Sequence, residues 1–593
     1  VFANIDQCPS SPDRWTVDGL GCAVIQYPIP WDAGPYSTSR YGVASNFNFA
    51  TKYDGNWQFS TQWDGNSSYL FIFLQSSNSY MNSLWNQNVG DLLSDMPENG
   101  HIFFGSYDSD WQNDVDLMAG RVNNYRGSQS SEKQLWIDEN VHFVNQQAGS
   151  IGGGLGGVIQ SWGKFYYGID RFQQWREIGS LYNWARTLQS QPEYRFDYIA
   201  NEAGMWNEEF FVEKRSEDPG ITTVDIFAGD RHSGGWSGGY TTHGSATLPS
   251  ASVMSTFNTL EVYLEHSCSE HRDRYGIDDD GDGSADRYGG CHEWDYLHYL
   301  KICDEGSNSS CGTEFVRYIT TYGREGRWVT DISPLLWMIK DGGLRNFTYQ
   351  GANGGWLNAT LMFSNWDDDG LRPTHGEVAF TGGYFNSNYN NESAHDRRYD
   401  INTTTQWDKV EIAAIVTGHG FGNDPNNCAE FCNHEPFFEL NGNDVTHDFP
   451  MAGNGSLSSD KEGCQKTVDM GTVANQLGSW PFGRAGWCPG LDVEPWLFDI
   501  TNWVNWAGQN EVLYQGLWDG QQYTETSNNP NIRALIWVVY YENTSLVGPN
   551  FVDLGQPIFV SDDSVGEPVL SIIQRVDNQT ILVREEEAAV IDD

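Results

Sequence analysis

The pattern of apolar and polar positions separates the first part of the chain from the rest. Residues 69–74 form a continuous apolar run, as in a strand buried on both faces. Shorter apolar strands are expected at 102–104 and 141–144. Apolar residues recur at helical spacing in four further segments, 81–93, 111–122, 172–182 and 199–211. Strands that alternate with helices predict a small α/β domain with a largely parallel sheet over residues 61–218.

After residue 218 the pattern changes to short strands between clusters of Gly, Asn and Asp. Strands are expected at 259–264, 316–321 and 534–541, and helical periodicity is scarce. This pattern is typical of antiparallel sandwich architecture. The fold class expected for the whole chain is therefore α+β multidomain, with the small α/β domain followed by antiparallel β structure.

The two ends of the chain differ in composition from the rest and from each other. Residues 1–60 are rich in Gly, Pro, Ser and Tyr and predict an N-terminal lobe of loops and a few strands, stapled by Cys8 and Cys22. Residues 546–593 combine apolar patches with the acidic run Glu585–Glu587 and predict an extended acidic C-terminal tail. Extended apolar segments can add a strand to an exposed sheet edge, so we expect the tail to bind other copies of the chain.

The composition limits the class of partner. The chain has 593 residues, too many for one hydrophobic core, and its 80 acidic and 33 basic residues give a net charge of −47. Such a surface repels nucleic acid and anionic membranes, so both are excluded as partners. No apolar run is long enough to span a bilayer, and the start at Val1 without a signal peptide is expected of a mature secreted chain.

The cysteines and glycosylation sequons also predict an extracellular protein. The ten cysteines fall into near neighbours, although spacing does not fix connectivity. Local pairing would give Cys8–Cys22, Cys268–Cys291, Cys303–Cys311, Cys428–Cys432 and Cys464–Cys488. Disulfides indicate an oxidising compartment. Nine Asn-x-Ser/Thr sequons are candidate glycosylation sites, at Asn66, Asn308, Asn346, Asn358, Asn391, Asn402, Asn454, Asn543 and Asn578.

An acidic loop between Cys268 and Cys291 predicts a calcium site. Acidic residues or a hydroxyl stand at alternating positions, Asp278, Asp280, Asp282, Ser284 and Asp286, and Gly283 lies where the turn is sharp. Ca²⁺ takes six to eight hard oxygen ligands, which this spacing wraps around one ion. Position 12 of the loop is Gly289 rather than Glu, so a bidentate ligand must come from elsewhere. A merely solvated acidic turn is the alternative.

The glycine-rich run Gly152–Gly157 does not predict a nucleotide site. It lacks the Lys-Ser/Thr of a phosphate-binding loop, and Asp170 downstream is better explained as a helix cap. A flexible turn is the expected role. The α/β domain could be thioredoxin-like in shape, but it contains no Cys-x-x-Cys, so redox chemistry is excluded.

Three distant segments each place a charged residue and an aromatic ring beside a cysteine. They are CHEWDY at 291–296, CAEFC at 428–432 and RAGWCPG at 484–490. A disulfide next to a charged group holds the backbone in place, as a preorganised polar site requires. In this order, the segments resemble peptide-N-glycosidase F, a family of amidases that remove N-linked glycans from asparagine. The similarity extends over roughly residues 220–545.

The resemblance implies a fold and a set of site residues. It implies two antiparallel jelly rolls side by side, over 219–406 and 407–545. It also implies that Asp295 is the catalytic aspartate, Glu430 a second essential carboxylate and Arg484 a supporting arginine. A carboxylate can take a proton from water, and an arginine can offset charge on oxygen. Substrate contacts are expected from Trp294 and Trp487. The pairs 268–291, 428–432 and 464–488 match the family's disulfide pattern.

One difference from the family leaves two hypotheses about the function. A third carboxylate of the family would fall in FTYQGA at 347–352, where this chain offers Gln350 or Gly351 and no acid. Glutamine cannot carry a proton or a charge. We therefore favour a structural or glycan-binding subunit of an extracellular or cell-surface assembly with weak or lost amidase activity. The alternative is an active amidase that cleaves the glycan–asparagine bond. Both hypotheses give N-glycans or glycoproteins as partners.

Copper is not expected as a cofactor. The same double jelly roll occurs in copper monooxygenases, which need clustered His and Met ligands. In this sequence His292 and His298 lack such neighbours along the chain.

Overall fold

The apolar run that the sequence singled out forms a strand in the middle of the first sheet. In the computed structural model this sheet has the order β5-β4-β3-β6-β7. β3, β4 and β5 are parallel, β6 pairs antiparallel with β3, and β7 pairs antiparallel with β6. The strands are β3 Ser68–Leu74, β4 Gly100–Ser106, β5 Val141–Gln147, β6 Tyr166–Ile169 and β7 Trp175–Glu177.

Both faces of this sheet are covered. On one face, alternate residues of β3 pack against α2 to α5 and α7. On the other face, the intervening residues pack against α6 and against aromatic side chains of residues 44–63. The helices are α1 Phe59–Gln62, α2 Ser79–Trp85, α3 Gly90–Asp95, α4 Trp111–Arg126, α5 Ser131–Asn140, α6 Gly153–Trp162 and α7 Phe196–Ser216, with the short strands β1 Asn48–Ala50 and β2 Asn56–Gln58 and the 3₁₀ helix η2 Ala148–Ser150.

Three local predictions in this unit are wrong. The helix expected over 172–182 begins as strand β7, because its backbone pairs with β6 from Tyr167 opposite Glu177 to Ile169 opposite Trp175. The run Gly152–Gly157 is not a loop; most of it lies in α6. Its glycines let the helix approach other backbone closely, since a Cβ on Gly154 would lie 2.4 Å from the Ser45 carbonyl oxygen. Asp170 is no helix cap and instead pairs with Arg176.

The structure describes most of the chain. The described residues are 28–162, 166–178, 196–234, 241–267, 276–277, 287–288, 294–322, 324–365, 370–401, 405–420, 430–431, 434–449, 451–452, 463–474, 479–518, 520–526, 530–543, 558–561, 568–576 and 580–587. The predicted calcium ligands lie outside these residues, namely Asp278, Asp280, Asp282, Ser284 and Asp286.

The disulfide predictions have two different outcomes. Two of the five expected disulfides are present in the described part of the chain, Cys303–Cys311 and Cys464–Cys488. The other three predicted pairs have both cysteines outside the described residues, so they stay predictions: Cys8 with Cys22, Cys268 with Cys291, and Cys428 with Cys432. The structure therefore confirms the Cys464–Cys488 disulfide of the segment that carries Arg484, but it does not test the Cys428–Cys432 disulfide expected around Glu430.

The next part of the chain forms two four-stranded antiparallel sheets, ordered β15-β10-β17-β8 and β14-β13-β16-β9. We call this pair of sheets the first β unit. Its strands are β8 Thr222–His232, β9 Thr241–Ser250, β10 Thr259–Ser267, β13 Leu297–Ile302, β14 Thr313–Ile319, β15 Gly326–Asp331, β16 Gly342–Gln350 and β17 Gly355–Ser364, with α8 Ala251–Met254 and η5 Ser333–Ile339. The strands β11 Gly276–Ile277 and β12 Arg287–Tyr288 form a separate pair.

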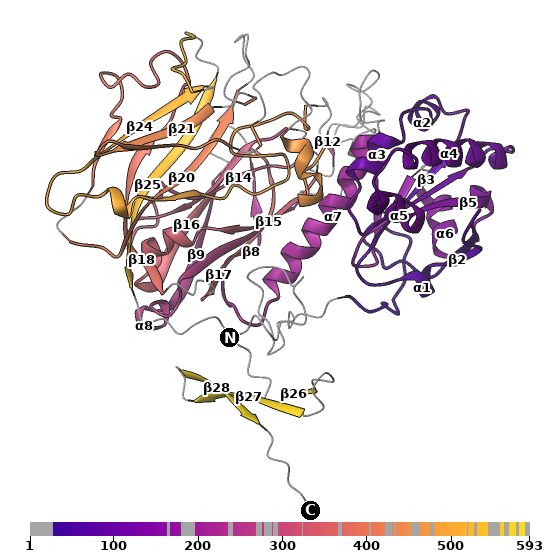
Figure 1. Ribbon diagram of the computed structural model, residues 1–593, viewed down its shortest axis with the longest axis horizontal. Helices are drawn as coiled ribbons and strands as arrows, with labels where there is room; N and C mark the ends of the chain where they lie inside the picture. The colour runs from indigo at the N-terminus through magenta and orange to yellow at the C-terminus, as the bar shows by residue number, and fades with distance from the viewer. Residues whose placement is uncertain are drawn as a thin grey trace, which may run out of the picture.

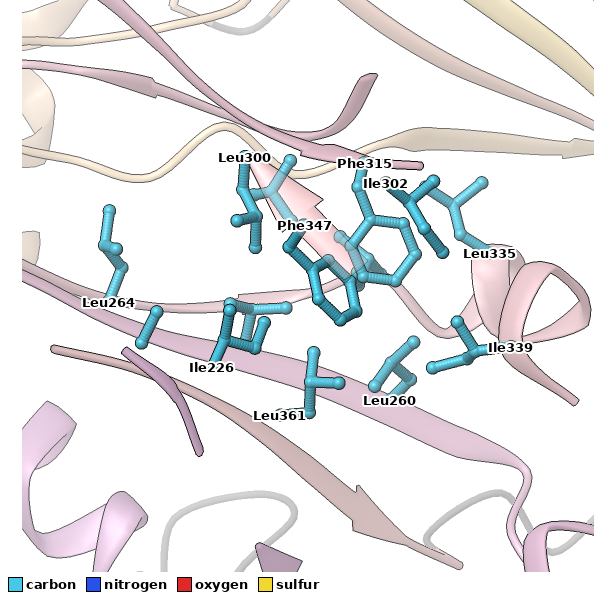
Figure 2. Close-up of a cluster of buried hydrophobic side chains, with 14 of the residues drawn as sticks. Ile226, Leu260, Leu264, Leu300, Ile302, Phe315, Leu335, Ile339, Phe347 and Leu361 are labelled. Carbon is cyan, nitrogen blue, oxygen red and sulfur yellow. The ribbon is translucent and has the colours of Figure 1, made fainter. Parts of the chain in front are cut away.

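The core of the first β unit lies between its two sheets (Figure 2). Leu260 and Leu264 on β10 face Leu300 on β13 and Phe347 on β16, because alternate side chains of a strand point to the same face. The apolar face of η5 closes one end of this layer with Leu335 and Ile339. The predicted sandwich arrangement follows from this alternation.

A second β unit repeats the arrangement with sheets ordered β18-β25-β20-β23 and β19-β24-β21-β22. Its strands are β18 Leu371–Thr381, β19 Arg398–Asp400, β20 Lys409–His419, β21 His434–Leu440, β22 Asn443–Thr446, β23 Trp496–Asp499, β24 Glu511–Trp518 and β25 Asn531–Asn543, with η6 Cys464–Met470 and η7 Thr501–Trp503. β18 pairs with β25, so strand pairing places it in the second unit, whereas our division from the sequence lay at 406/407.

The described part of the C-terminal tail is a small antiparallel sheet. β26 Ile558–Ser561, β27 Pro568–Val576 and β28 Thr580–Glu587 pair in sequence order. Figure 1 shows α7 lying between the α/β unit and the two β units. None of the helices in the described ranges combines the length and apolar character needed to cross a membrane.

Candidate active site

Asp295 lies just before β13, and Thr320 fixes the backbone on both sides of it. The Thr320 hydroxyl donates to the carbonyl of Trp294 at 3.0 Å and accepts from the amide of Tyr296 at 2.9 Å. The Thr320 amide also donates to the Tyr296 carbonyl at 3.0 Å. Because Thr320 directly follows β14, which pairs with β13, the sheet itself positions the Asp295 carboxyl.

Tyr322 provides the side-chain contact to Asp295. Its hydroxyl donates a hydrogen bond to the Asp295 carboxylate, and its ring is buried. Neither Tyr322 nor Thr320 was predicted from the sequence. The available signal was their place at the end of a predicted strand, but only the register of β13 and β14 brings them to Asp295.

Arg484 reaches the same place on a stapled loop of the second β unit. The Cys464–Cys488 disulfide closes this loop, and the Arg484 amide donates to the Met451 carbonyl at 2.7 Å. Gly486 adopts φ +79°, and a Cβ there would lie 1.7 Å from the Val416 carbonyl oxygen. Glycine is therefore required for the loop to lie against the end of β20.

The guanidinium of Arg484 is fully buried between two aromatic rings. Its Cζ lies 4.8 Å from the Phe431 ring centroid and 4.7 Å from that of Trp487. Nη1 donates to the Trp480 carbonyl at 3.2 Å, and Nε lies 3.7 Å from Glu430 Oε1. Nε and Nη2 have no hydrogen-bond partner among the described residues. Both nitrogens are buried, so the positive charge of Arg484 acts from inside the cluster.

The two carboxyls of the site hold their protons more tightly than usual. Burial raises the pKa of Asp295, against the opposing effects of Arg484, the Asp295 amide and the Tyr322 hydroxyl. Burial and the neighbouring Asp295 charge raise the pKa of Glu430 to about 8, and Arg484 opposes that rise. More groups therefore favour the ionised form of Asp295 than favour that of Glu430. Of the two carboxyls, Asp295 is the better placed to lose its proton, and Glu430 to keep its own.

Such a cluster combines a base, an acid and a cation. An ionised carboxyl can take a proton from water, and a protonated one can give a proton to a leaving nitrogen. A buried guanidinium with unused donors can stabilise negative charge on an oxygen. The chemistry that matches these groups is hydrolysis of an acyl or amide bond.

The structure thus brings together Asp295, Glu430 and Arg484, which are far apart in sequence. Trp294 is 39% exposed beside Asp295, so its ring is accessible. The expectation that Trp487 contacts substrate is wrong for this structure. Trp487 is fully buried, stacks on His419 with ring centroids 5.5 Å apart and donates to the Gly418 carbonyl at 2.9 Å.

The acid-free segment of the sequence lies next to this cluster. Gln350 ends β16 opposite Tyr299 of β13. Asn353, three residues later, is buried, and its Nδ2 lies 3.4 Å from the Thr320 hydroxyl that it donates to. An amide side chain, and no carboxyl, therefore connects this segment to Thr320 in the described part of the site.

His298 has histidine neighbours that its sequence position did not reveal. Its ring centroid lies 5.1 Å from that of His266 and 6.0 Å from that of His232. Both ring nitrogens of His298 are hydrogen-bonded, Nδ1 to the Tyr349 hydroxyl at 2.6 Å and Nε2 to the Asn353 amide at 3.2 Å. Those of His232 contact the Thr242 hydroxyl and the Gly351 carbonyl, each at 2.8 Å. Burial lowers the pKa of all three histidines.

The sequons differ in their surroundings. The Nδ2 atoms of Asn346 and Asn358 donate to Ser307 and Glu265. The Oδ1 atoms of Asn66 and Asn391 accept from Arg171 and Ser393. Asn308, Asn391 and Asn543 are exposed. Asn402, Asn454 and Asn578 lie outside the described residues.

Residues 388–539 match the family model "Peptide-N-glycosidase F, C terminal". No match was found among the curated proteins. The solved structure of PNGase F, a glycosylasparaginase from Flavobacterium meningosepticum, is 17% identical over 56% of this chain and 98% of that chain, with a TM-score of 0.40. Copper-bound ScoI from Bradyrhizobium japonicum is 14% identical over 23% of this chain and 88% of that chain, with a TM-score of 0.15.

Proposed function

The chain contains a peptide-N-glycosidase F-like module, and from this premise we propose that it is an amidase that hydrolyses the amide bond between an N-glycan and asparagine. The observation that carries the proposal is the meeting of Asp295, Glu430 and Arg484 in one buried cluster. The proposal is supported by the electrostatic effect of Arg484 on both carboxyls, and it gives the amidase, which the sequence analysis kept as the alternative, the first place.

The proposed reaction uses each group once. Asp295 takes a proton from a water molecule as the water oxygen attacks the amide carbon. Arg484 stabilises the negative charge that develops on the amide oxygen through the positive charge of its guanidinium, which also lies beside Glu430. Glu430 gives its proton to the departing nitrogen. The C–N bond breaks to leave aspartate on the peptide and a glycosylamine, and a sugar ring packs on the exposed face of Trp294.

A glycopeptide assay tests this proposal. The full-length protein is incubated with a glycopeptide that carries one N-glycan, and conversion of its asparagine to aspartate is followed by mass spectrometry. We expect turnover by the wild type and by Asp116→Asn, a surface carboxylate paired with Lys52, and none by Asp295→Asn. Equal turnover by Asp295→Asn would refute the assignment.

A second candidate is a glycan-binding subunit without turnover. It is favoured by the segment 350–353, which carries no acid. In the same assay the wild type would then bind the glycopeptide without converting it. Binding to immobilised glycopeptide, lost in Trp294→Ala and kept in Asp116→Asn, would support this candidate.

The wider proposal concerns fold, location and partners. We propose that the two β units are jelly rolls, supported by their paired four-stranded antiparallel sheets, and that the α/β unit is thioredoxin-like, supported by its parallel strands with helices on both faces. We also propose a secreted glycoprotein that associates with other copies through residues 546–593. Deletion of these residues should reduce the size of the particle in solution. If full-length and truncated chains are both monomers, the association proposal fails.

Calcium is the proposed structural ion of residues 278–286. The support is the antiparallel pairing of β11 with β12, Gly276 opposite Tyr288, which brings the two ends of that segment together. Calorimetric titration of the metal-free protein with Ca²⁺ should show binding that Asp280→Asn weakens. Equal binding by the variant would exclude this ligand set.

A further inference from the structure

We propose that helix α7 of the α/β unit holds the candidate active site in shape, and that Glu202 and Asn201 on this helix are positioning residues for Tyr322 and Arg484. The inference rests on the proposed amidase function and adds a role for a unit outside the peptide-N-glycosidase F-like module. α7 lies between the α/β sheet and the β units (Figure 1).

Glu202 fixes the turn that presents Tyr322. Its Oε1 lies 2.7 Å from Nη2 of Arg324, two residues after Tyr322, and both side chains are almost fully buried. The hydroxyl of Thr321 closes the turn by donating to the carbonyls of Arg324 at 2.6 Å and Glu325 at 2.9 Å. Removal of one partner of a buried ion pair leaves an unpaired charge, so the turn must shift without Glu202.

Asn201 fixes the stapled loop that carries Arg484. Its Nδ2 donates to the Thr472 carbonyl at 2.7 Å, and this bond is buried. The next residue, Val473, donates from its amide to the Pro489 carbonyl at 2.7 Å, directly after the disulfide at Cys488. Asn201 is therefore linked through the backbone to the loop on which Arg484 lies.

Apolar packing supports the same contact. Trp480, whose carbonyl accepts from Arg484, is fully buried in the core that includes Ile199, Ala203 and Trp206 of α7. At the end of η6, Gly471 adopts φ +101° and approaches Glu208 so closely that a Cβ would lie 2.7 Å from the Glu208 Cβ. The helix and the loop thus share a core rather than a solvated surface.

One rigid element therefore contacts both segments that act on Asp295. A second buried pair, Arg215 with Glu261 of β10, fastens the far end of the helix to the first β unit. Catalytic groups need to be held within about 0.5 Å of their productive positions, and a misplacement of about 1 Å can cost about 100-fold in rate. Loosening α7 should consequently lower turnover more than substrate binding.

The test compares three substitutions in the full-length chain. Glu202→Gln removes the ion pair of α7 with Arg324, and Asn201→Ala removes its hydrogen bond to the Thr472 carbonyl. Glu217→Gln is the matched control, because Glu217 is an exposed residue just beyond α7 that pairs with Lys214. With the N-glycosylated peptide as substrate, we expect kcat to fall about tenfold or more in the first two variants while KM stays within about twofold, and both to stay unchanged in Glu217→Gln.

Hydrogen exchange separates this inference from the proposed function. Glu202→Gln should increase amide exchange in peptides that cover 316–325, and Asn201→Ala in peptides that cover 463–490, with no change in Glu217→Gln. If the wild type has no turnover, the proposed function fails, but these exchange patterns still decide the role of α7. Wild-type kcat and wild-type exchange in both variants would overturn the α7 proposal. Glu202→Gln could lower the melting temperature of the whole chain. In that case the kcat and the hydrogen exchange of Asn201→Ala, which removes only a neutral hydrogen bond, test the α7 proposal.

Discussion

Replacing Arg484 by methionine tests the electrostatics of the candidate site. Arg484 favours the ionised forms of both Asp295 and Glu430. At an effective dielectric constant of about 20, unit charges at the 3.7 Å between Arg484 Nε and Glu430 Oε1 interact by about 4 kcal/mol, or about 3 pKa units. This figure is an upper bound, because the Glu430 side chain is 14% exposed and water screens it in part.

The assay is the pH dependence of kcat/KM on the glycopeptide. In the wild type we expect a bell-shaped profile whose alkaline limb reflects loss of the Glu430 proton near pH 8. In Arg484→Met both limbs should move to higher pH, because both pKa values rise, and the maximum of kcat/KM should fall, because the amide oxygen loses the positive charge that stabilises it. Arg398→Met, which removes an exposed arginine paired with Glu392 and Glu511, is the control and should leave the profile unchanged.

Thermal unfolding gives a readout that does not need turnover. The folded pKa of Glu430 lies above its value in the unfolded chain, so its contribution to stability is full below about pH 4.5 and is lost as the pH rises through about 8. Without Arg484 that loss grows, so Arg484→Met should lower the melting temperature more at pH 8.5 than at pH 4.5. Equal shifts at the two pH values, with unmoved limbs of the activity profile, would refute the proposed coupling of the three groups.

Three further predictions concern stability and modification. Burial and Glu494 raise the pKa of Glu208 to about 7, so Glu208→Gln should stabilise the chain by up to about 3 kcal/mol at pH 8 and by little at pH 4, measured by denaturant unfolding. Gly486→Ala should lower both stability and amidase activity, whereas Gly520→Ala, also at positive φ but with open space around its Cβ, should leave activity intact. Mass-spectrometric mapping should find glycans at the exposed Asn308, Asn391 and Asn543 and none at Asn346 or Asn358, because the Nδ2 atoms of these two, which would carry the glycan, donate to Ser307 and Glu265.

The elements that the sequence predicted well are those whose pattern is set locally. β3 is a continuous apolar run because helices or aromatic side chains cover both of its faces. α4 shows its buried positions at helical spacing, so it was found at nearly its full length. The segment at 172–182 has the same spacing, yet its start pairs with β6, and such pairing is decided by a partner strand rather than by the segment itself.

The site was only partly accessible from the sequence. Asp295, Glu430 and Arg484 could be singled out because each stands in a short segment with a cysteine and an aromatic residue. Tyr322 could not, since its contact with Asp295 depends on the register of β13 and β14. The pair Glu202 and Arg324 was equally hidden, because charged residues normally lie at the surface and nothing local marks these two as buried.

The absence of an acid in residues 350–353 has a different meaning once the cluster is assembled. Amide hydrolysis needs one base and one acid, and the unequal surroundings of Asp295 and Glu430 already separate these two roles. A third carboxyl beside them would add negative charge and raise the pKa values of both, which would disfavour the ionised form of the base. The amide of Asn353 adds no such charge, while it still donates to the Thr320 hydroxyl that holds the backbone around Asp295. An acid-free segment is therefore compatible with turnover by the two remaining carboxyls.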